Sequence, residues 1–240
     1  MTTREDGRTP EEIRPVAVTL DYQQWADGSV LLDMGKTRVL VSASYEERVP
    51  RWLMGSGKGW VTAEYSMLPR ATLERTPREV TKGRPSGRTQ EIQRLIGRSL
   101  RAVTDLTKMP EVMITIDCDV LQADGGTRTA SITAGYIALA LALRKLREKG
   151  IVKEDPLVDG VAAISCGIVG GARYLDLDYS EDSSAEVDFN VVMTASGKIV
   201  EVQGTAEETP FSRDDLDVML DLAQSGIERL AAIQDEVLAG

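Results

Sequence analysis

The sequence of 240 residues contains no histidine, and this absence excludes a large share of enzyme chemistry. Without an imidazole there is no histidine general base, no Ser-His-Asp triad and no histidine ligand for a metal. The only two cysteines, Cys118 and Cys166, lie in apolar, strand-like runs. That setting favours buried thiols over a catalytic thiolate, a zinc site or a disulfide. Any chemistry must therefore use carboxylates, arginine, lysine, hydroxyl groups, backbone amides or a hard metal ion.

Long hydrophobic stretches are missing as well, since no run approaches the roughly 18 apolar residues that cross a bilayer. Residues 1–12 are polar and charged, carry no signal-peptide core, and are expected to be frayed. With two reduced cysteines, these features predict a cytoplasmic protein with no membrane partner. A hydrophobic content of 42% is enough for a genuine core. We predict one domain over residues 1–240, with a joint between two layers near residues 155–160.

The net charge of −10 conceals a strong segregation of charge along the chain. Residues 70–101 hold nine basic side chains against three acidic ones, whereas residues 155–240 hold eighteen acidic against four basic. Prolines and glycines in the first half of the basic segment predict an irregular, mobile loop. A basic stripe of this kind suits contact with a phosphate backbone, and the alternative is a solvated charged loop and helix face.

Apolar periodicity divides the chain into strands that precede each of three helices. Alternation predicts strands at residues 29–34, 37–44, 61–68, 112–121, 161–168, 172–179, 187–194 and 198–203. Helical spacing predicts helices over residues 89–104 and 130–146 and from Ser212 onward, the last with Asp215 in a near capping box. This order of elements favours an α/β fold of the layered α+β kind.

The segment Asp124-Gly125-Gly126-Thr127-Arg128-Thr129 joins a predicted strand to a predicted helix. A glycine pair lets a ligand approach the backbone closely, and the first amides of a helix lack intrahelical partners. With the arginine added, the segment is suited to bind an anion, phosphate above all. The alternative is a tight turn with a solvated arginine. Arg88 follows Gly87 just before the helix expected at Thr89, so it has the same placement.

Asp182 and Asp188 stand out in an acidic stretch because a short Ser-Ser-Ala link separates them. A chain reversal there would bring the two carboxylates together. Such a pair could hold Mg²⁺ through oxygen ligands, or one of its members could act as a general acid. The alternative is an acidic surface loop.

Four motifs stand out along the chain: Gly59–Tyr65 with Leu68–Arg70, Gly87–Thr89 with Glu91–Arg94, Asp117–Thr129, and Val202–Glu207. Together they resemble the ribonuclease PH family of phosphate-dependent 3′ exoribonucleases that mature tRNA ends. The similarity runs from Ile13-Arg14-Pro15 to the last helix. The resemblance implies a ribosomal protein S5 domain 2-like fold and a homohexamer assembled as a trimer of dimers.

The same resemblance implies roles for individual residues. Arg88, Gly126, Thr127 and Arg128 would bind inorganic phosphate, the co-substrate, and Asp182 and Asp188 would serve catalysis and bind Mg²⁺ or Mn²⁺. Arg70, Arg75 and Arg78 would contact the RNA, with tRNA precursors and other RNA 3′ ends as substrates.

The expected reaction is attack of phosphate on the terminal phosphodiester, which releases a nucleoside diphosphate and needs no histidine. Two alternatives remain open at this point. One is an inactive ring subunit that binds RNA without cleaving it, although a pure binder has no need of a paired carboxylate site. The other is a metal-dependent nuclease that uses water.

Overall fold

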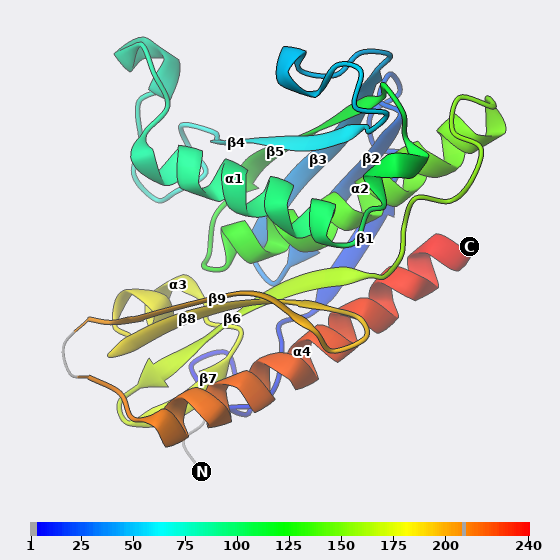
Figure 1. Cartoon of the computed structure of the whole chain (residues 1–240). Coiled ribbons are helices and arrows are strands. Elements are labelled where there is room, and N and C mark those ends of the chain that lie inside the picture. The colour runs from blue at the N-terminus through cyan, green and yellow to red at the C-terminus, as the bar shows by residue number, and fades with distance from the viewer. Residues whose placement is uncertain (1–3, 208–209) are drawn as a thin grey trace.

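The computed structural model describes residues 4–207 and 210–240, which form two β-sheets and helices in alternating layers (Figure 1). The first sheet has the strand order β1-β2-β3-β5-β4, and the second has the order β7-β6-β8-β9. The strands are β1 (Val16–Leu20), β2 (Gly28–Met34), β3 (Thr37–Glu46), β4 (Trp60–Met67), β5 (Met113–Gln122), β6 (Val161–Val169), β7 (Ala172–Leu175), β8 (Val187–Thr194) and β9 (Ile199–Ala206). The helices are α1 (Gly87–Ala102), α2 (Thr127–Glu148), α3 (Tyr179–Ser183) and α4 (Arg213–Ala239), with 3-10 turns η1 (Arg51–Leu53), η2 (Glu79–Lys82) and η3 (Leu106–Lys108).

The first sheet is antiparallel except at one edge, where β4 runs parallel to β5. Its alternating sequence turns one side chain in two toward α1 and α2, so that Val39 and Val41 of β3 and Ile114 and Ile116 of β5 are fully buried. Parallel neighbours need a long crossover connection, and α1 supplies the crossover from β4 to β5.

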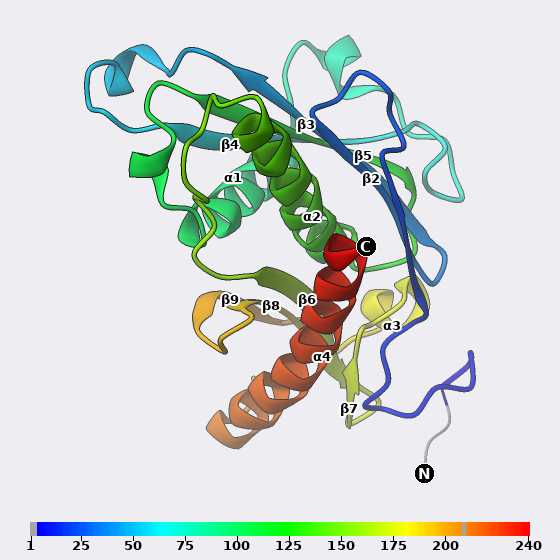
Figure 2. The ribbon, with the colours of Figure 1, turned by 90° about the vertical axis from the view of Figure 1, so that its right-hand side faces the viewer.

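Helix α2 lies between the two sheets and is buried along most of its length (Figures 1 and 2). It is rich in alanine, leucine and isoleucine on all sides, as expected for a helix that contacts protein all round. The approach to the first sheet is close: a Cβ on Gly28 would meet the carbonyl oxygen of Ala138 at 2.3 Å. Glycine at that position therefore sets how deeply α2 packs against β2.

Helix α4 covers the outer face of the second sheet, opposite α2 (Figure 2). Its apolar stripe includes the buried Met219, Ala223, Ile227 and Leu230. The helix starts at a capping box in which Ser212 and Asp215 bond each other's backbone amides, as predicted. Within the described residues, no helix combines the length and apolar character that a bilayer crossing requires.

The expected α/β layering is confirmed, and most predicted elements are present within a few residues of their predicted bounds. The expectation of a frayed start was wrong for residues 4–12, while residues 1–3 lie outside the described part of the chain. Arg4 and Arg8 are buried there, because their guanidinium groups donate to the carbonyl oxygens of Leu175, the last residue of β7, and of Asp176. Strand β1 was missed, and the strand predicted at 172–179 ends at Leu175.

Candidate active site

The turn between β5 and α2 has the backbone geometry expected of an anion site. Gly125 and Gly126 have φ values of 74° and 64°, in the left-handed region that favours glycine. A Cβ on Gly125 would meet the carbonyl oxygen of Leu177 at 2.5 Å, so this position excludes a side chain. Helix α2 begins at Thr127, and no side chain among the described residues caps its first amides. Those amides are therefore free to bind an anion.

Two residues outside the turn hold it in place. The Thr37 hydroxyl accepts a hydrogen bond from the Asp124 amide at 2.9 Å and donates one to the Gly125 carbonyl at 2.7 Å. The Arg14 guanidinium donates to the Asp124 carbonyl and is itself bound by Asp176 at 2.7 Å. The turn is thus tied to β3 on one side and to the segment that follows β7 on the other.

Tyr65 of β4 contacts the same helix start. Its hydroxyl lies 2.8 Å from the Thr127 hydroxyl, and both residues are buried. Burial raises the pKa of Tyr65, while the Thr127 hydrogen bond and the charges of Arg88 and Arg128 oppose that rise. Tyr65 therefore stays protonated at neutral pH, and the charges of Arg88 and Arg128 act on its hydroxyl group.

Arg128 lies in the first turn of α2 and is already engaged by polar partners. Its guanidinium donates to the side-chain oxygen of Gln203 on β9 at 2.9 Å, and it lies 3.7 Å from the Glu91 carboxylate on α1. Arg88 lies in the first turn of α1, which begins at Gly87, two residues earlier than predicted, with Ser86 as the N-cap. Both arginines thus extend from the first turns of helices, as the sequence indicated.

Asp182 comes from α3 and Asp188 from β8, and the charge of Asp182 acts on Asp188. Burial raises the pKa of Asp182 against the charges of Arg128, Arg88 and Arg14. Burial, followed by the charge of Asp182, raises the pKa of Asp188 against the charge of Arg128 and a hydrogen bond from Asn190. The charge of Arg128 therefore acts on both carboxylates, and the charge of Asp182 also acts on Asp188. The structure brings together Arg88, Arg128, Asp182 and Asp188, which we call the charged site.

The three arginines predicted to contact RNA belong to one segment of the chain. Arg70, Arg75 and Arg78 are exposed on the loop between β4 and α1. Arg78 also lines a cavity of about 350 Å³ that extends to Tyr65 and Thr89.

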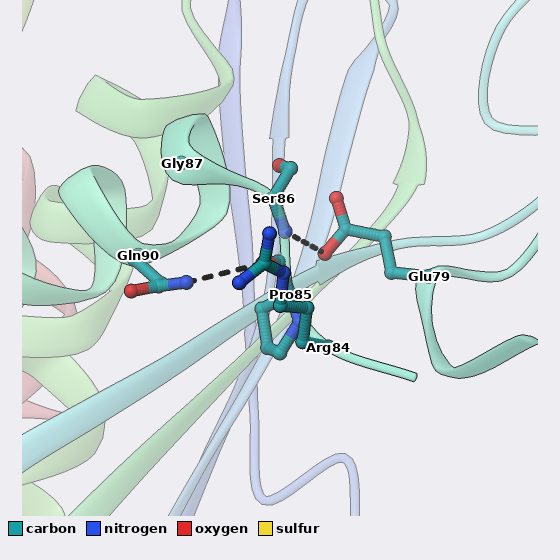
Figure 3. Close-up of a pocket in the computed structure, with 6 residues that line it drawn as sticks. All are labelled: Glu79, Arg84, Pro85, Ser86, Gly87 and Gln90. Carbon is teal, nitrogen blue, oxygen red and sulfur yellow. Dashed lines mark hydrogen bonds between the residues drawn. The ribbon is translucent and has the colours of Figure 1, made fainter. Parts of the chain in front are cut away.

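A second cavity of about 430 Å³ adjoins the first at the start of α1 (Figure 3). Figure 3 shows the Glu79 carboxylate facing Ser86, whose amide donates to it at 3.2 Å, and Gln90 bonded to the Pro85 carbonyl at 3.1 Å. Glu79 also accepts from the Thr89 hydroxyl at 2.8 Å. The exposed basic loop is therefore fastened at its far end to the helix that carries Arg88.

The helical part of the predicted basic stripe is partly used for internal contacts. Arg98 forms an ion pair with Glu201 of β9. Arg101 stacks over the Trp60 ring, 4.3 Å from its centroid, and donates to the Val61 carbonyl at 2.7 Å. The surface free to meet a polyanion is consequently the loop that carries Arg70, Arg75 and Arg78 more than the later turns of α1.

Two family profiles match this chain in succession. Residues 12–145 match domain 1 of the 3′ exoribonuclease family, and residues 159–226 match domain 2. The chain belongs to the 3′ exoribonuclease family.

Individual members of the 3′ exoribonuclease family are similar over almost the full length of the chain. Ribonuclease PH of Methylobacterium radiotolerans is 60% identical over 98% of this chain and 100% of its own. Ribonuclease PH of Bacillus subtilis is 58% identical over 98% of this chain and 96% of its own. The resemblance that the four motifs carried is confirmed, and with it the phosphorolytic exoribonuclease class.

A solved structure of the Archaeoglobus fulgidus exosome with RNA bound to the active site has the same fold. One of its chains superposes with a TM-score of 0.78 and 22% identity, covering 95% of this chain and 91% of the archaeal one. At that identity the similarity is evidence for the fold alone. It agrees with the expected ribosomal protein S5 domain 2-like architecture.

Several residues of the site lay outside the sequence-based prediction. Thr37, Tyr65, Gln203 and Asn190 contact the predicted residues directly, yet each is an ordinary polar residue in a strand. Tyr65 and Gln203 lie inside the quoted motifs, and Arg14 lies where the similarity begins; that position was the one available signal for them. The four motifs of the exoribonuclease family meet at one place because the turn, two strands and the start of α1 converge there.

Proposed function

We propose that this chain shortens RNA from its 3′ end by phosphorolysis at the charged site. The observation that carries the proposal is the convergence of Arg88 and Arg128 on the carboxylates Asp182 and Asp188, beside the uncapped start of α2. Phosphate bound by the two arginines and by the amides near Gly126 and Thr127 would lie next to the paired carboxylates. We also propose that residues 1–240 form a single domain.

The reaction requires alignment more than a protein nucleophile. A phosphate oxygen attacks the terminal phosphorus, the bond to the 3′ oxygen of the preceding nucleotide breaks, and that oxygen leaves with a proton. The products are a nucleoside diphosphate and an RNA one nucleotide shorter. The arginines and helix amides would hold two mutually repelling anions in line and stabilise charge in the transition state.

A divalent ion, Mg²⁺ or Mn²⁺, fits the pair Asp182 and Asp188. Each carboxyl has a raised pKa, and for Asp188 the charge of Asp182 is one of the causes, a repulsion that a bound cation would relieve. No group of three or more acidic, histidine or cysteine side chains in the described residues could hold a metal. The two aspartates would therefore share the ion with water and substrate oxygens, as Mg²⁺ allows. When bound, the ion would neutralise charge on the phosphoryl oxygens.

The proposed substrates are tRNA precursors and other RNA 3′ ends, guided by the exposed loop. Arg70, Arg75 and Arg78 would contact the RNA backbone upstream of the charged site. We further propose a homohexamer built as a trimer of dimers and a cytoplasmic location, in line with the relatives named ribonuclease PH and with the two free cysteines.

A single assay tests the reaction class. RNA with an unprocessed 3′ tail is incubated with and without inorganic phosphate, and the released mononucleotides are separated by charge. Nucleoside diphosphates that appear only with phosphate support phosphorolysis, while monophosphates support hydrolysis and intact RNA supports a pure binder. Arg128→Ala should raise the phosphate requirement and slow the reaction by about 2–4 kcal/mol in the transition state. Unchanged phosphate dependence in that variant would refute the assignment of Arg128.

A further inference from the structure

We propose that Gln203 is a positioning residue that aims the Arg128 guanidinium at the phosphate. This inference rests on the proposed function, because it concerns the same phosphate site. The primary observation is a hydrogen bond of 2.9 Å from Arg128 to the side-chain oxygen of Gln203, which joins α2 to the second sheet. Gln203 lies on β9, 75 residues away in sequence.

Two carboxylates determine which end of the Gln203 amide faces Arg128. Its nitrogen donates to Glu91 of α1 at 3.1 Å and to Glu201 of β9 at 3.1 Å. An ionised carboxylate only accepts hydrogen bonds and a guanidinium only donates them. In the opposite orientation, the amide NH₂ group would face the Arg128 donors and the amide oxygen would face the two carboxylates. The amide oxygen is therefore held toward Arg128.

The partners of Gln203 are themselves fixed. Glu201 is paired with Arg98 of α1, and Glu91 lies 3.7 Å from Arg128. Glu201 and Gln203 are two residues apart on β9 and so lie on one face of the second sheet. Gln203 also pairs in register with Asn190 of β8, whose amide donates to Asp188 at 3.1 Å. Two neighbouring amides on the sheet thus hold one member each of the charged site.

An oriented arginine binds phosphate better than a mobile one. A free arginine side chain has considerable rotamer entropy, which is lost when the anion binds. The network around Gln203 removes that freedom in advance and leaves the remaining N–H groups of Arg128 for the ligand. Removing the amide should therefore weaken phosphate binding without removing the charge that stabilises the transition state.

The test compares Gln203→Met with wild type in the full chain. Methionine is similar in length and apolar, so it removes the polar contacts with little change of volume. We expect the KM for phosphate in phosphorolysis, and the Kd for inorganic phosphate by calorimetry, to rise about tenfold, while kcat at saturating phosphate falls less than threefold. Gln203→Asn, one methylene shorter, should change both constants in the same direction.

Gln224→Met is the matched control, because Gln224 is an exposed glutamine whose amide bonds Glu228 on α4. Its phosphate constants should equal those of wild type. The double variant Gln203→Met with Arg128→Ala separates positioning from general damage. If Gln203 acts through Arg128, Gln203→Met should cause no further loss of kcat/KM for phosphate in the Arg128→Ala background.

Unchanged phosphate constants in Gln203→Met, or an equal loss in both backgrounds, would overturn the positioning role. A fall in Tm beyond that of the control with no change in phosphate Kd would also overturn it. Release of monophosphates by wild type would refute phosphorolysis alone, because the calorimetric Kd still decides the role of Gln203. Absence of phosphate binding to wild type would refute both.

Discussion

Two clusters of arginines and aspartates lie close to each other in this fold, and they are built in opposite ways. One is the charged site. The other, which we call the arginine anchor, consists of Arg4, Arg8, Arg14, Asp176 and Glu181. In the anchor, Asp176 is 1% exposed and accepts from both the backbone amide and the guanidinium of Arg14, at 2.7 to 2.9 Å. In the charged site, burial and the charges of Arg128, Arg88, Arg14 and Glu207 act on Asp182, with no hydrogen bond among these causes.

The two clusters differ in whether their charges have partners within the protein. The anchor has such partners, whereas the charged site lacks some of them. Buried charges are tolerated when each has an opposite charge and hydrogen bonds, and the anchor meets both conditions. Although burial lowers the pKa of Arg14, Asp176 raises it above its ordinary value. Both aspartates of the charged site instead have raised pKa values, because their surroundings disfavour the ionised form. A bound cation would supply the missing partner of the two aspartates, and phosphate would pair with the arginines.

The largest expected effect comes from breaking the anchor with Asp176→Asn. Asp176 has a φ of 54°, a conformation that asparagine also tolerates, so the substitution removes the charge without straining the backbone. Arg14 would keep its buried charge but lose its partner, and the free energy of unfolding should fall by about 3–5 kcal/mol. Urea denaturation followed by circular dichroism measures this loss. Asp21→Asn is the control, because Asp21 has a φ of 52° on the surface. A loss equal to that of the control would show that the arginine anchor does not stabilise the fold.

The reverse behaviour is expected of the charged site. Asp188→Asn should slow phosphorolysis about 100- to 1,000-fold, because a group proposed to act on the reacting atoms is lost. The same change removes one of two repelling carboxylates, so the Tm should equal or exceed that of wild type. Steady-state kinetics and calorimetry measure the two quantities. Asp217→Asn, on the exposed face of α4, should alter neither the rate nor the Tm measurably. A destabilised and still active Asp188→Asn protein would show that this aspartate belongs with the anchor.

The sequence predicted the charged site far better than the anchor, for a physical reason. Arg88, Arg128 and the glycine pair lie beside helix starts, so local pattern alone indicated an anion site. The anchor joins Arg4 and Arg14 to Asp176 and Glu181 across more than 160 residues, and no local pattern encodes such a contact. Asp176 and Glu181 consequently received no role in the prediction, and residues 4–12 were expected to be frayed. Strand β1 was missed although Val16, Val18 and Leu20 alternate with Ala17 and Thr19, because the run is only five residues long.

Tyr65→Phe removes a hydrogen bond that is already formed within the site, next to two carboxylates whose ionised form lacks a partner. The change removes only the hydroxyl that lies 2.8 Å from the Thr127 hydroxyl. We expect a loss of about 1 kcal/mol in the free energy of unfolding, with a few-fold rise in the KM for phosphate because Thr127 loses its orientation. Urea denaturation and phosphate-dependent kinetics measure both. Tyr22→Phe, on an exposed tyrosine, should match wild type. A loss of stability with unchanged KM would place Tyr65 with the anchor.

The smallest effect is expected at an ion pair that is neither buried nor part of the site. Asp215 accepts hydrogen bonds from Ser212 and Arg173, and these lower its pKa from 3.8 to about 2. Because the pKa is lower in the folded state, the stabilisation is fully present above pH 3.8 and is lost as the pH falls toward 2. The difference in urea midpoint between wild type and Asp215→Ala should therefore be constant from neutral pH to about pH 5 and shrink below pH 4. Asp214→Ala, in the same helical turn, is the control. A difference that does not change with pH would show that Asp215 acts through its shape rather than its charge, unlike either cluster.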